Sequence, residues 1–368
     1  MQNPLLEPFE INSLKLKNRT VMAPMTRSFS PGHVPGPNVA EYYARRAAGG
    51  VGLIITEGTN INHSASAGYP NVPVIFGEKA LAGWEKVTEA VHKEGGKIAC
   101  QLWHVGCVRS PEFDPDQQIP SMGPSGILYT PPGFLNHSVH EMTLAEVEEV
   151  IAAFAEGAAM AKKVGFDAIE IHGAHGYLID QFFWDVTNKR TDRFGGATLA
   201  DRTTFAVEII KACREKLGVD FPIIFRFSNW KLASYEQHLF KNPEDLKAFL
   251  EPLKNAGVDI FHASSRNFDL PEFEGSHLNL AGWTKKFTQR PTISVGSVGL
   301  EEDFIQSFKE SKANVSIENL IDRLSHNEFD LIAIGRALIG DPNWVQKIIE
   351  NRFDEIKPYT KECLTQLY

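Results

Sequence analysis

Short runs of apolar residues recur along the chain, and glycine or proline closes most of them. Such runs are typical of buried strands, and the longer amphipathic stretches between them are typical of helices. We expect eight strands, at residues 20–23, 53–57, 97–103, 168–171, 222–228, 259–263, 291–295 and 329–334. We expect helices at residues 38–48, 78–94, 144–163, 198–217, 243–255, 300–309, 317–324 and 342–350.

This alternation of strands and helices predicts a parallel sheet. Eight such units in one chain of 368 residues favour an α/β fold, the closed (β/α)8 TIM barrel, over a doubly wound sheet. No Gly-x-Gly-x-x-Gly follows the first strand, which weakens a Rossmann-type alternative. Because no change in composition marks a linker, we expect a single domain spanning residues 1–368.

Two segments lie outside this alternation. Residues 8–17 alternate around Asn12 and Ser13 and predict a short N-terminal hairpin before the barrel. Residues 105–143 hold many Pro, Gly and Ser residues and little helical period. A segment of this length between core elements is usually functional, so we expect a long excursion, a lid, after the third strand. Thr143 and Glu146 have the spacing of a capping box and start the next helix.

The composition narrows the class of protein. Hydrophobic residues make up 43% of the chain and charged residues 23%, which is enough for a large core. The net charge of −9 argues against nucleic acid or an anionic membrane as a partner. No long apolar run and no secretory signal are visible, so a cytoplasmic location is expected. The spacing of the four cysteines suits neither zinc nor a disulfide framework, and we expect no metal site.

Polar side chains gather where the fourth strand ends. The apolar run up to Ile171 breaks at Gly173 into a loop that carries His172, His175 and Tyr177. In a barrel the carboxyl ends of the strands meet at one mouth, where the chemistry lies. Two imidazoles and a phenol just past one strand end favour an active site over turn residues with satisfied side chains. Metal binding and acid–base work both remain open at this point.

The last two strands end in a pattern typical of phosphate binding. Gly296 and Gly335 close these strands, and Ser297 and Arg336 follow them. Glycine lets backbone N–H groups approach an anion, and arginine adds a bidentate charge. The alternative is that both glycines form plain turns and that Arg336 pairs with an acid. Two such glycines followed by an arginine favour the phosphate site.

Arg226 lies in an apolar strand, where a charge is costly unless it is paired. Its partner is either a structural carboxylate, Glu170 or Glu57, or a ligand that carries or develops negative charge. The two interpretations are close to evenly balanced. Gln101 presents an amide that suits the mixed edge of a heterocyclic ring, or it is a hydrogen-bonded core residue.

Other candidates admit a structural and a functional interpretation. Thr26 either caps a turn or donates a hydrogen bond to a ligand. Trp103 and Tyr69 are core or rim aromatics, or they line an apolar substrate slot. Cys107 follows a strand end, where a plain small side chain is favoured over a reactive thiol.

Several motifs together resemble the old yellow enzyme family of FMN-dependent ene-reductases. They lie at residues 14–27, 101–104, 172–178, 190–196, 295–298 and 334–343, in the family's order and over nearly the whole chain. The resemblance implies a tightly bound, non-covalent FMN across the barrel mouth. It implies that Pro24, Met25, Thr26 and Gly58 line the flavin's reactive edge, that Gln101 bonds the pyrimidine edge, that Arg226 faces the N1/C2-carbonyl region, and that Gly296, Ser297, Gly335 and Arg336 hold the phosphate.

The resemblance also implies a reaction. His172 and His175, the His/His version of the family's substrate motif, would bind the oxygen of an activated alkene such as an enone, enal or nitroalkene. Tyr177 would protonate the carbon next to the one that receives hydride. NADPH or NADH would reduce the flavin first. Thr26 stands where one branch of the family has cysteine, so the chain looks closer to the classical branch.

Two segments, residues 229–238 and 359–368, depart from the members of the family. Arg266 reaches either the outer pocket or the phosphate of a nicotinamide nucleotide, or it forms a surface salt bridge, which is the favoured interpretation. Three rival functions stay open. One is a lyase or isomerase acting on a phosphorylated substrate, and another is a non-enzymatic flavin-binding protein. The third is a metallohydrolase using His104, His172, His175 and His262. We expect a monomer or a small homo-oligomer acting on small molecules.

Overall fold

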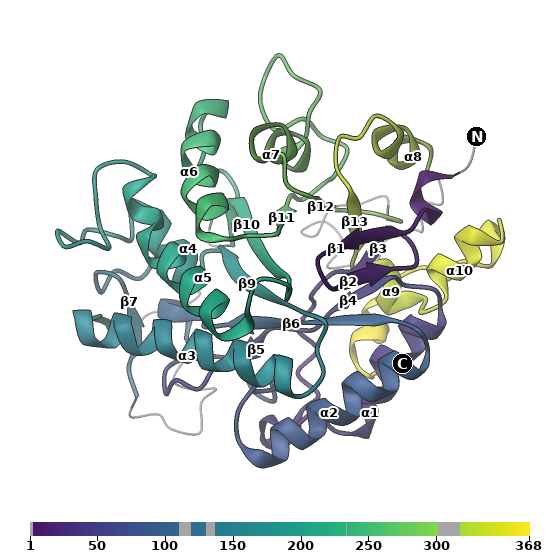
Figure 1. Cartoon of the computed structure of the whole chain (residues 1–368), viewed down its shortest axis with the longest axis horizontal. Coiled ribbons are helices and arrows are strands. Elements are labelled where there is room, and N and C mark those ends of the chain that lie inside the picture. The colour runs from purple at the N-terminus through teal and green to yellow at the C-terminus, as the bar shows by residue number, and fades with distance from the viewer. Residues whose placement is uncertain (1–2, 110–118, 130–136, 233, 301–316) are drawn as a thin grey trace.

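A computed structural model describes residues 3–109, 119–129, 137–232, 234–300 and 317–368. Eight parallel strands form a closed barrel at its centre (Figure 1). In order around the barrel they are β3 (Thr20–Met22), β4 (Leu53–Ile55), β6 (Lys97–Trp103), β9 (Ala168–His175), β10 (Ile223–Lys231), β11 (Ile260–Ser264), β12 (Thr292–Val295) and β13 (Leu331–Ile334). Closure is complete because β13 pairs with β3. The predicted TIM barrel is confirmed.

Helices surround the barrel on its outside (Figure 1). They are α1 (Pro37–Ala48), α2 (Glu78–Lys93), α3 (Leu144–Lys163), α5 (Thr204–Leu217), α6 (Pro243–Ala256), α7 (Leu280–Thr288) and α8 (Glu318–Ser325). Shorter helices are α4 (Leu178–Phe183), α9 (Arg336–Gly340) and α10 (Trp344–Ile349). The sequence pattern missed α4, α7 and α9, and the helix expected at residues 300–309 lies almost wholly outside the described residues.

Strand side chains alternate between two apolar cores. In β4, Leu53 and Ile55 point into the barrel, whereas Ile54 faces the helices. The predicted hairpin is present as β1 (Phe9–Ile11) and β2 (Leu14–Leu16). Leu14 and Leu16 join the interior core. Because the hairpin directly precedes β3, it plugs the amino-terminal end of the barrel and leaves the carboxyl end for a site.

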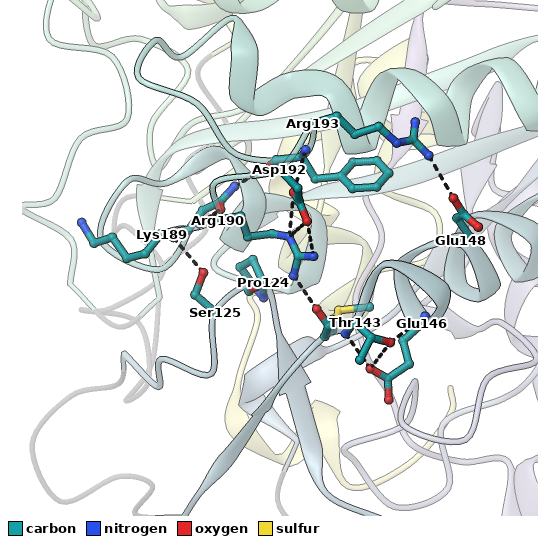
Figure 2. Close-up of polar contacts among 12 residues, drawn as sticks. Pro124, Ser125, Thr143, Glu146, Glu148, Lys189, Arg190, Asp192 and Arg193 are labelled. Carbon is teal, nitrogen blue, oxygen red and sulfur yellow. Dashed lines mark hydrogen bonds and ion pairs between the residues drawn. The ribbon is translucent and has the colours of Figure 1, made fainter.

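The excursion after β6 is tied to the body of the protein. Its described part includes η3 (Gly106–Val108) and a parallel pair of short strands, β7 (Ser121–Gly123) and β8 (Val139–Glu141). Nη1 of Arg190 donates hydrogen bonds to the carbonyl of Pro124, just after β7, at 2.8 Å and to that of Met142, just after β8, at 2.5 Å. Figure 2 shows Arg190 near Pro124 and Thr143. Residues 110–118 and 130–136 lie outside the described residues, so the lid stays a prediction.

The start of α3 follows its predicted pattern. Thr143 Oγ1 accepts the backbone N–H of Glu146 at 3.3 Å, and the Glu146 carboxylate accepts the N–H of Thr143 at 2.7 Å. A capping bond of this kind is worth about 1 kcal/mol. None of the described helices is both long enough and apolar enough to cross a bilayer.

Candidate active site

His172 and His175 lie in strand β9, so the loop expected after Gly173 is wrong. The strand continues because its neighbour β10 also continues: Arg226 pairs with His172 and, after a register shift, Lys231 pairs with His175. His175 has a left-handed backbone, with φ of +65°, a conformation that costs a non-glycine residue ~1–2 kcal/mol. The two imidazole rings lie perpendicular, with centroids 5.2 Å apart.

Both imidazoles are neutral at physiological pH. Burial, followed by the nearby charge of Arg226, holds the pKa of His172 and of His175 well below the ordinary value. A neutral imidazole carries a single N–H donor. In His172, Nδ1 accepts the backbone N–H of Ala174 at 3.3 Å, so the proton resides on Nε2.

Tyr177 is the residue that precedes α4, and its ring joins an aromatic cluster. Its hydroxyl lies 3.1 Å from that of Tyr69, and its ring meets Trp103 edge-on at 4.9 Å and His172 at 5.2 Å. Tyr69 stacks on Trp103 at 5.5 Å. Burial raises the pKa of Tyr177 well above its ordinary value, so the phenol keeps its proton. Sequence positions from three segments thus meet in one cluster.

Arg226 is 7% exposed, and neither of the proposed structural carboxylates pairs with it among the described residues. Glu170 instead accepts Nε2 of Gln101 at 2.7 Å and contacts Nδ1 of His262 at 2.6 Å. Glu57 accepts backbone N–H groups of residues 27 and 28 at 2.9 and 3.0 Å. The Nε atom of Arg226 is buried and has no partner in the described part of the chain. Neither carboxylate therefore forms a direct ion pair with Arg226 among the described residues. Burial lowers the pKa of Arg226 and the nearby charge of Glu170 opposes this shift, so Glu170 still compensates the arginine charge at a distance. The contact of Arg226 with a ligand stays a prediction.

Gln101 is a hydrogen-bonded core residue, and its contact with a heterocyclic ring stays a prediction. Its amide is a core group to the extent that it donates to Glu170, and this bond fixes the direction of the amide plane. Glu170 lies between Gln101 and His262 and is completely buried. Both carboxylate oxygens of Glu170 are thus engaged, whereas Nε2 of His262 has no hydrogen-bond partner among the described residues.

The ends of β3, β4 and β13 come together. Gly335 lies beside Met25, whose Sδ would be 3.5 Å from a Cβ at position 335. Met25 follows Pro24 and precedes Thr26 in the segment after β3. Gly58 lies against Trp103, and a Cβ there would be 2.2 Å from the Trp103 ring, so only glycine fits. Trp103 in turn stacks beside His172 with ring centroids 6.0 Å apart, so Gly58 lies at the same end of the barrel as the histidines.

The expected phosphate-binding residues are neighbours, because Val295 pairs with Ala333 and their strands end side by side. Gly296 has φ of +138°, and a Cβ there would meet the backbone of residues 266 and 267 at 2.7 Å. Ser297 donates its hydroxyl to the carbonyl of Arg266 at 3.0 Å. Arg336 begins α9, with its guanidinium 5.9 Å from the ring of Tyr359.

The NADH:flavin oxidoreductase / NADH oxidase family matches residues 4–355, nearly the whole chain. The chain belongs to this family. The NADH oxidase of Thermoanaerobacter brockii is 34% identical over 94% of this chain, and the alignment covers 51% of that protein. This chain thus spans about half the length of that relative.

Two further relatives within the flavin oxidoreductase family are reductases by name. The 12-oxophytodienoate reductase 2 of Arabidopsis thaliana is 37% identical over 70% of each chain. The structure of morphinone reductase in complex with tetrahydroNAD matches with a TM-score of 0.81 at 27% identity, covering 98% of this chain and 93% of that one. The resemblance to the old yellow enzymes is confirmed at the level of the family, and the His/His branch stays a prediction.

Two described residues of the segment that departs from the family, Trp230 and Tyr235, lie beside the histidines. Trp230 stacks on His175 at 4.5 Å, Tyr235 stacks on Trp230 at 5.3 Å, and the guanidinium of Arg266 lies 5.3 Å from the Tyr235 ring. Arg266 is thus placed by an aromatic ring. The sequence around Arg266 gives no sign that its side chain packs on Tyr235.

Cys107 behaves as a plain small side chain. Burial raises the pKa of its thiol to about 12, so the thiol stays protonated.

Proposed function

We propose that this protein is an FMN-dependent ene-reductase, in which NADPH or NADH supplies the electrons and an activated alkene such as an enone, enal or nitroalkene accepts them. The observation that carries the proposal is the arrangement of two neutral imidazoles beside a protonated phenol, with His172 at 5.2 Å from both His175 and Tyr177. The family membership and the reductase names of its relatives support it.

The residues at the mouth fit an FMN. The Nε atom of Arg226 is buried and meets no acceptor in the part of the chain that the structure describes, so it offers a donor and a charge to an acceptor that gathers electrons. The amide of Gln101, held by Glu170, offers a directed polar edge. The residues that would hold the group are Pro24, Met25, Thr26, Gly58, Gln101 and Arg226 at the ring system and Gly296, Ser297, Gly335 and Arg336 at the phosphate. When bound, FMN supplies the hydride chemistry.

The imidazoles would bind and polarise the alkene. Each presents one N–H to the carbonyl or nitro oxygen, where negative charge develops as the double bond is reduced. Removing one such donor typically lowers a rate by ~10²–10³-fold. Because His172 and His175 are neutral, they stabilise the charge without giving up a proton.

Tyr177 would supply the proton. Its raised pKa keeps the hydroxyl hydrogen in place until a strongly basic carbon forms next to it. The hydroxyl of Tyr69, 3.1 Å away, can then hydrogen-bond to the phenolate that Tyr177 leaves behind. Trp103 and Tyr69 would line the substrate pocket as its apolar wall.

Absorption spectra of the FMN-loaded protein test this function. We expect NADPH or NADH to bleach the flavin band and an activated enone to restore it. A colourless protein that cannot be reconstituted with FMN refutes the proposal. A flavin that is reduced but passes no electrons to any enone, enal or nitroalkene refutes the ene-reductase and favours a flavin-binding protein.

A further inference from the structure

Ser264 is a buried hydroxyl that joins the arginine and one imidazole of the site. It is the last residue of β11 and is 2% exposed. Its Oγ lies 3.1 Å from Nη2 of Arg226 and 2.8 Å from Nε2 of His175. These three side chains come from three adjacent elements of the barrel, and the contacts form a continuous hydrogen-bonded chain.

The direction of these bonds follows from the donor inventory. A guanidinium has donors and no acceptor, so the Ser264 oxygen accepts from Arg226. The hydroxyl hydrogen then needs an acceptor, because an unsatisfied buried donor is costly. Within the described residues, Nε2 of His175 is the acceptor that Ser264 Oγ meets. The hydroxyl therefore donates to Nε2, and the single proton of the neutral ring lies on Nδ1.

We propose that Ser264 is a positioning residue that holds His175 in its Nδ1–H tautomer and couples it to Arg226. The effect of Ser264 on alkene reduction rests on the proposed ene-reductase function, whereas the tautomer of His175 does not. His172, whose Nδ1 accepts a backbone N–H, carries its proton on Nε2. The two imidazoles thus present opposite ring nitrogens as donors.

The other contacts of His175 leave this choice to Ser264. Its backbone N–H donates to Ser228 Oγ at 3.0 Å, and its ring face stacks on Trp230 at 4.5 Å. These contacts fix the backbone and the plane of the ring, and neither distinguishes the two ring nitrogens. The coupling to Arg226 has a further consequence, because a charge that donates to a hydroxyl strengthens the bond that the hydroxyl donates in turn.

The tautomer can be measured directly, without any turnover. The ¹⁵N shifts of imidazole nitrogens separate protonated from unprotonated atoms, and the signals of His175 among the 12 histidines are those lost in a His175→Asn variant. In the flavin-free wild type we expect His175 protonated at Nδ1. In Ser264→Ala we expect a shift toward the other tautomer or a mixture of both.

Two control variants complete the experiment. Ser264→Thr keeps the hydroxyl and should keep the tautomer. Ser265→Ala removes a neighbouring hydroxyl that donates to the carbonyl of Val295 at 2.7 Å and should change nothing at His175. In the FMN-loaded protein, Ser264→Ala should slow reoxidation of the reduced flavin by an enone about 10- to 100-fold, whereas both controls should retain most of the rate.

Two results overturn the proposal: a wild-type His175 protonated at Nε2, or a Ser264→Ala variant that keeps the wild-type tautomer, whatever its rate. The wild-type spectrum decides even if a variant does not fold. If the wild type shows the Nδ1–H tautomer and yet reduces no alkene, the ene-reductase function is refuted while the hydrogen-bond assignment stands.

Discussion

Lys231 and Asp180 form a completely buried ion pair that contacts the backbone of Gly176, and Lys231→Met tests what this pair does. Both side chains have 0% exposure. The second carboxylate oxygen of Asp180 accepts the backbone N–H of Gly176 at 2.5 Å, between His175 and Tyr177. Methionine keeps the apolar stem of lysine and removes its charge, so the variant isolates the charge from the packing.

Breaking a buried pair by removing one partner costs about 3–5 kcal/mol, because the remaining charge is buried alone. Unfolding entropy of ~2.1 cal/mol/K per residue gives roughly 0.8 kcal/mol/K for 368 residues, so Tm should fall by about 4–6 °C. In Asp180→Asn/Lys231→Met, both charges are absent and the Asn oxygen still accepts the Gly176 N–H. The double variant should therefore recover most of the loss.

The loss should also depend on pH. Burial raises the pKa of Asp180, and the charge of Lys231 opposes this rise. Without Lys231 the folded pKa lies further above the unfolded value of ~3.9. A carboxyl whose pKa is raised in the folded state contributes stability that is present below its pKa in the unfolded state. This stability is lost as pH rises through its pKa in the folded state. Lys231→Met should therefore be closer to the wild type at pH 5 than at pH 8.

Thermal unfolding followed by circular dichroism at both pH values is the measurement. Lys216→Met is the matched control, because the pair of Lys216 with Glu156 is about half exposed and spans 3.8 Å. An exposed pair of this kind contributes about 0–1 kcal/mol. A Lys231→Met variant that melts with the control at pH 8, or a double variant as unstable as the single one, refutes the reasoning.

Three further variants test the site. Tyr177→Phe should slow alkene reduction and leave flavin reduction by NADPH largely intact in stopped-flow traces; equal losses in both half-reactions contradict its role as proton donor. Arg226→Met removes a charged hydrogen-bond donor worth about 1.5–3 kcal/mol, so FMN should bind about 10- to 100-fold more weakly in a fluorescence titration, and unchanged affinity contradicts its placement at the flavin. Gly58→Ala places a Cβ 2.2 Å from the Trp103 ring and should destabilise the protein by about 1–3 kcal/mol in urea unfolding, whereas wild-type stability means the ring moves freely.

The sequence pattern determined the barrel because each strand is a local signal. A buried parallel strand is apolar on both faces, and the turn residues that close it follow directly in the chain. The same locality explains the misses. The strand expected to stop at Ile171 continues to His175 because β10, far along the chain, extends to Lys231 and pairs with it. Nothing near Gly173 in the sequence encodes that partner.

The sequence also determined which chemical groups are available, since barrel closure brings all strand ends to one mouth. Only the tertiary structure decided which groups bind each other. Glu170 accepts a hydrogen bond from the Gln101 amide and contacts the His262 ring. Because both of its oxygens are engaged, Arg226 donates its hydrogen bond to the Ser264 hydroxyl instead of to a carboxylate. The physical reason is that a buried polar group takes the partner that neighbouring strands place within about 3 Å, and strand register, a property of the closed barrel, sets that choice.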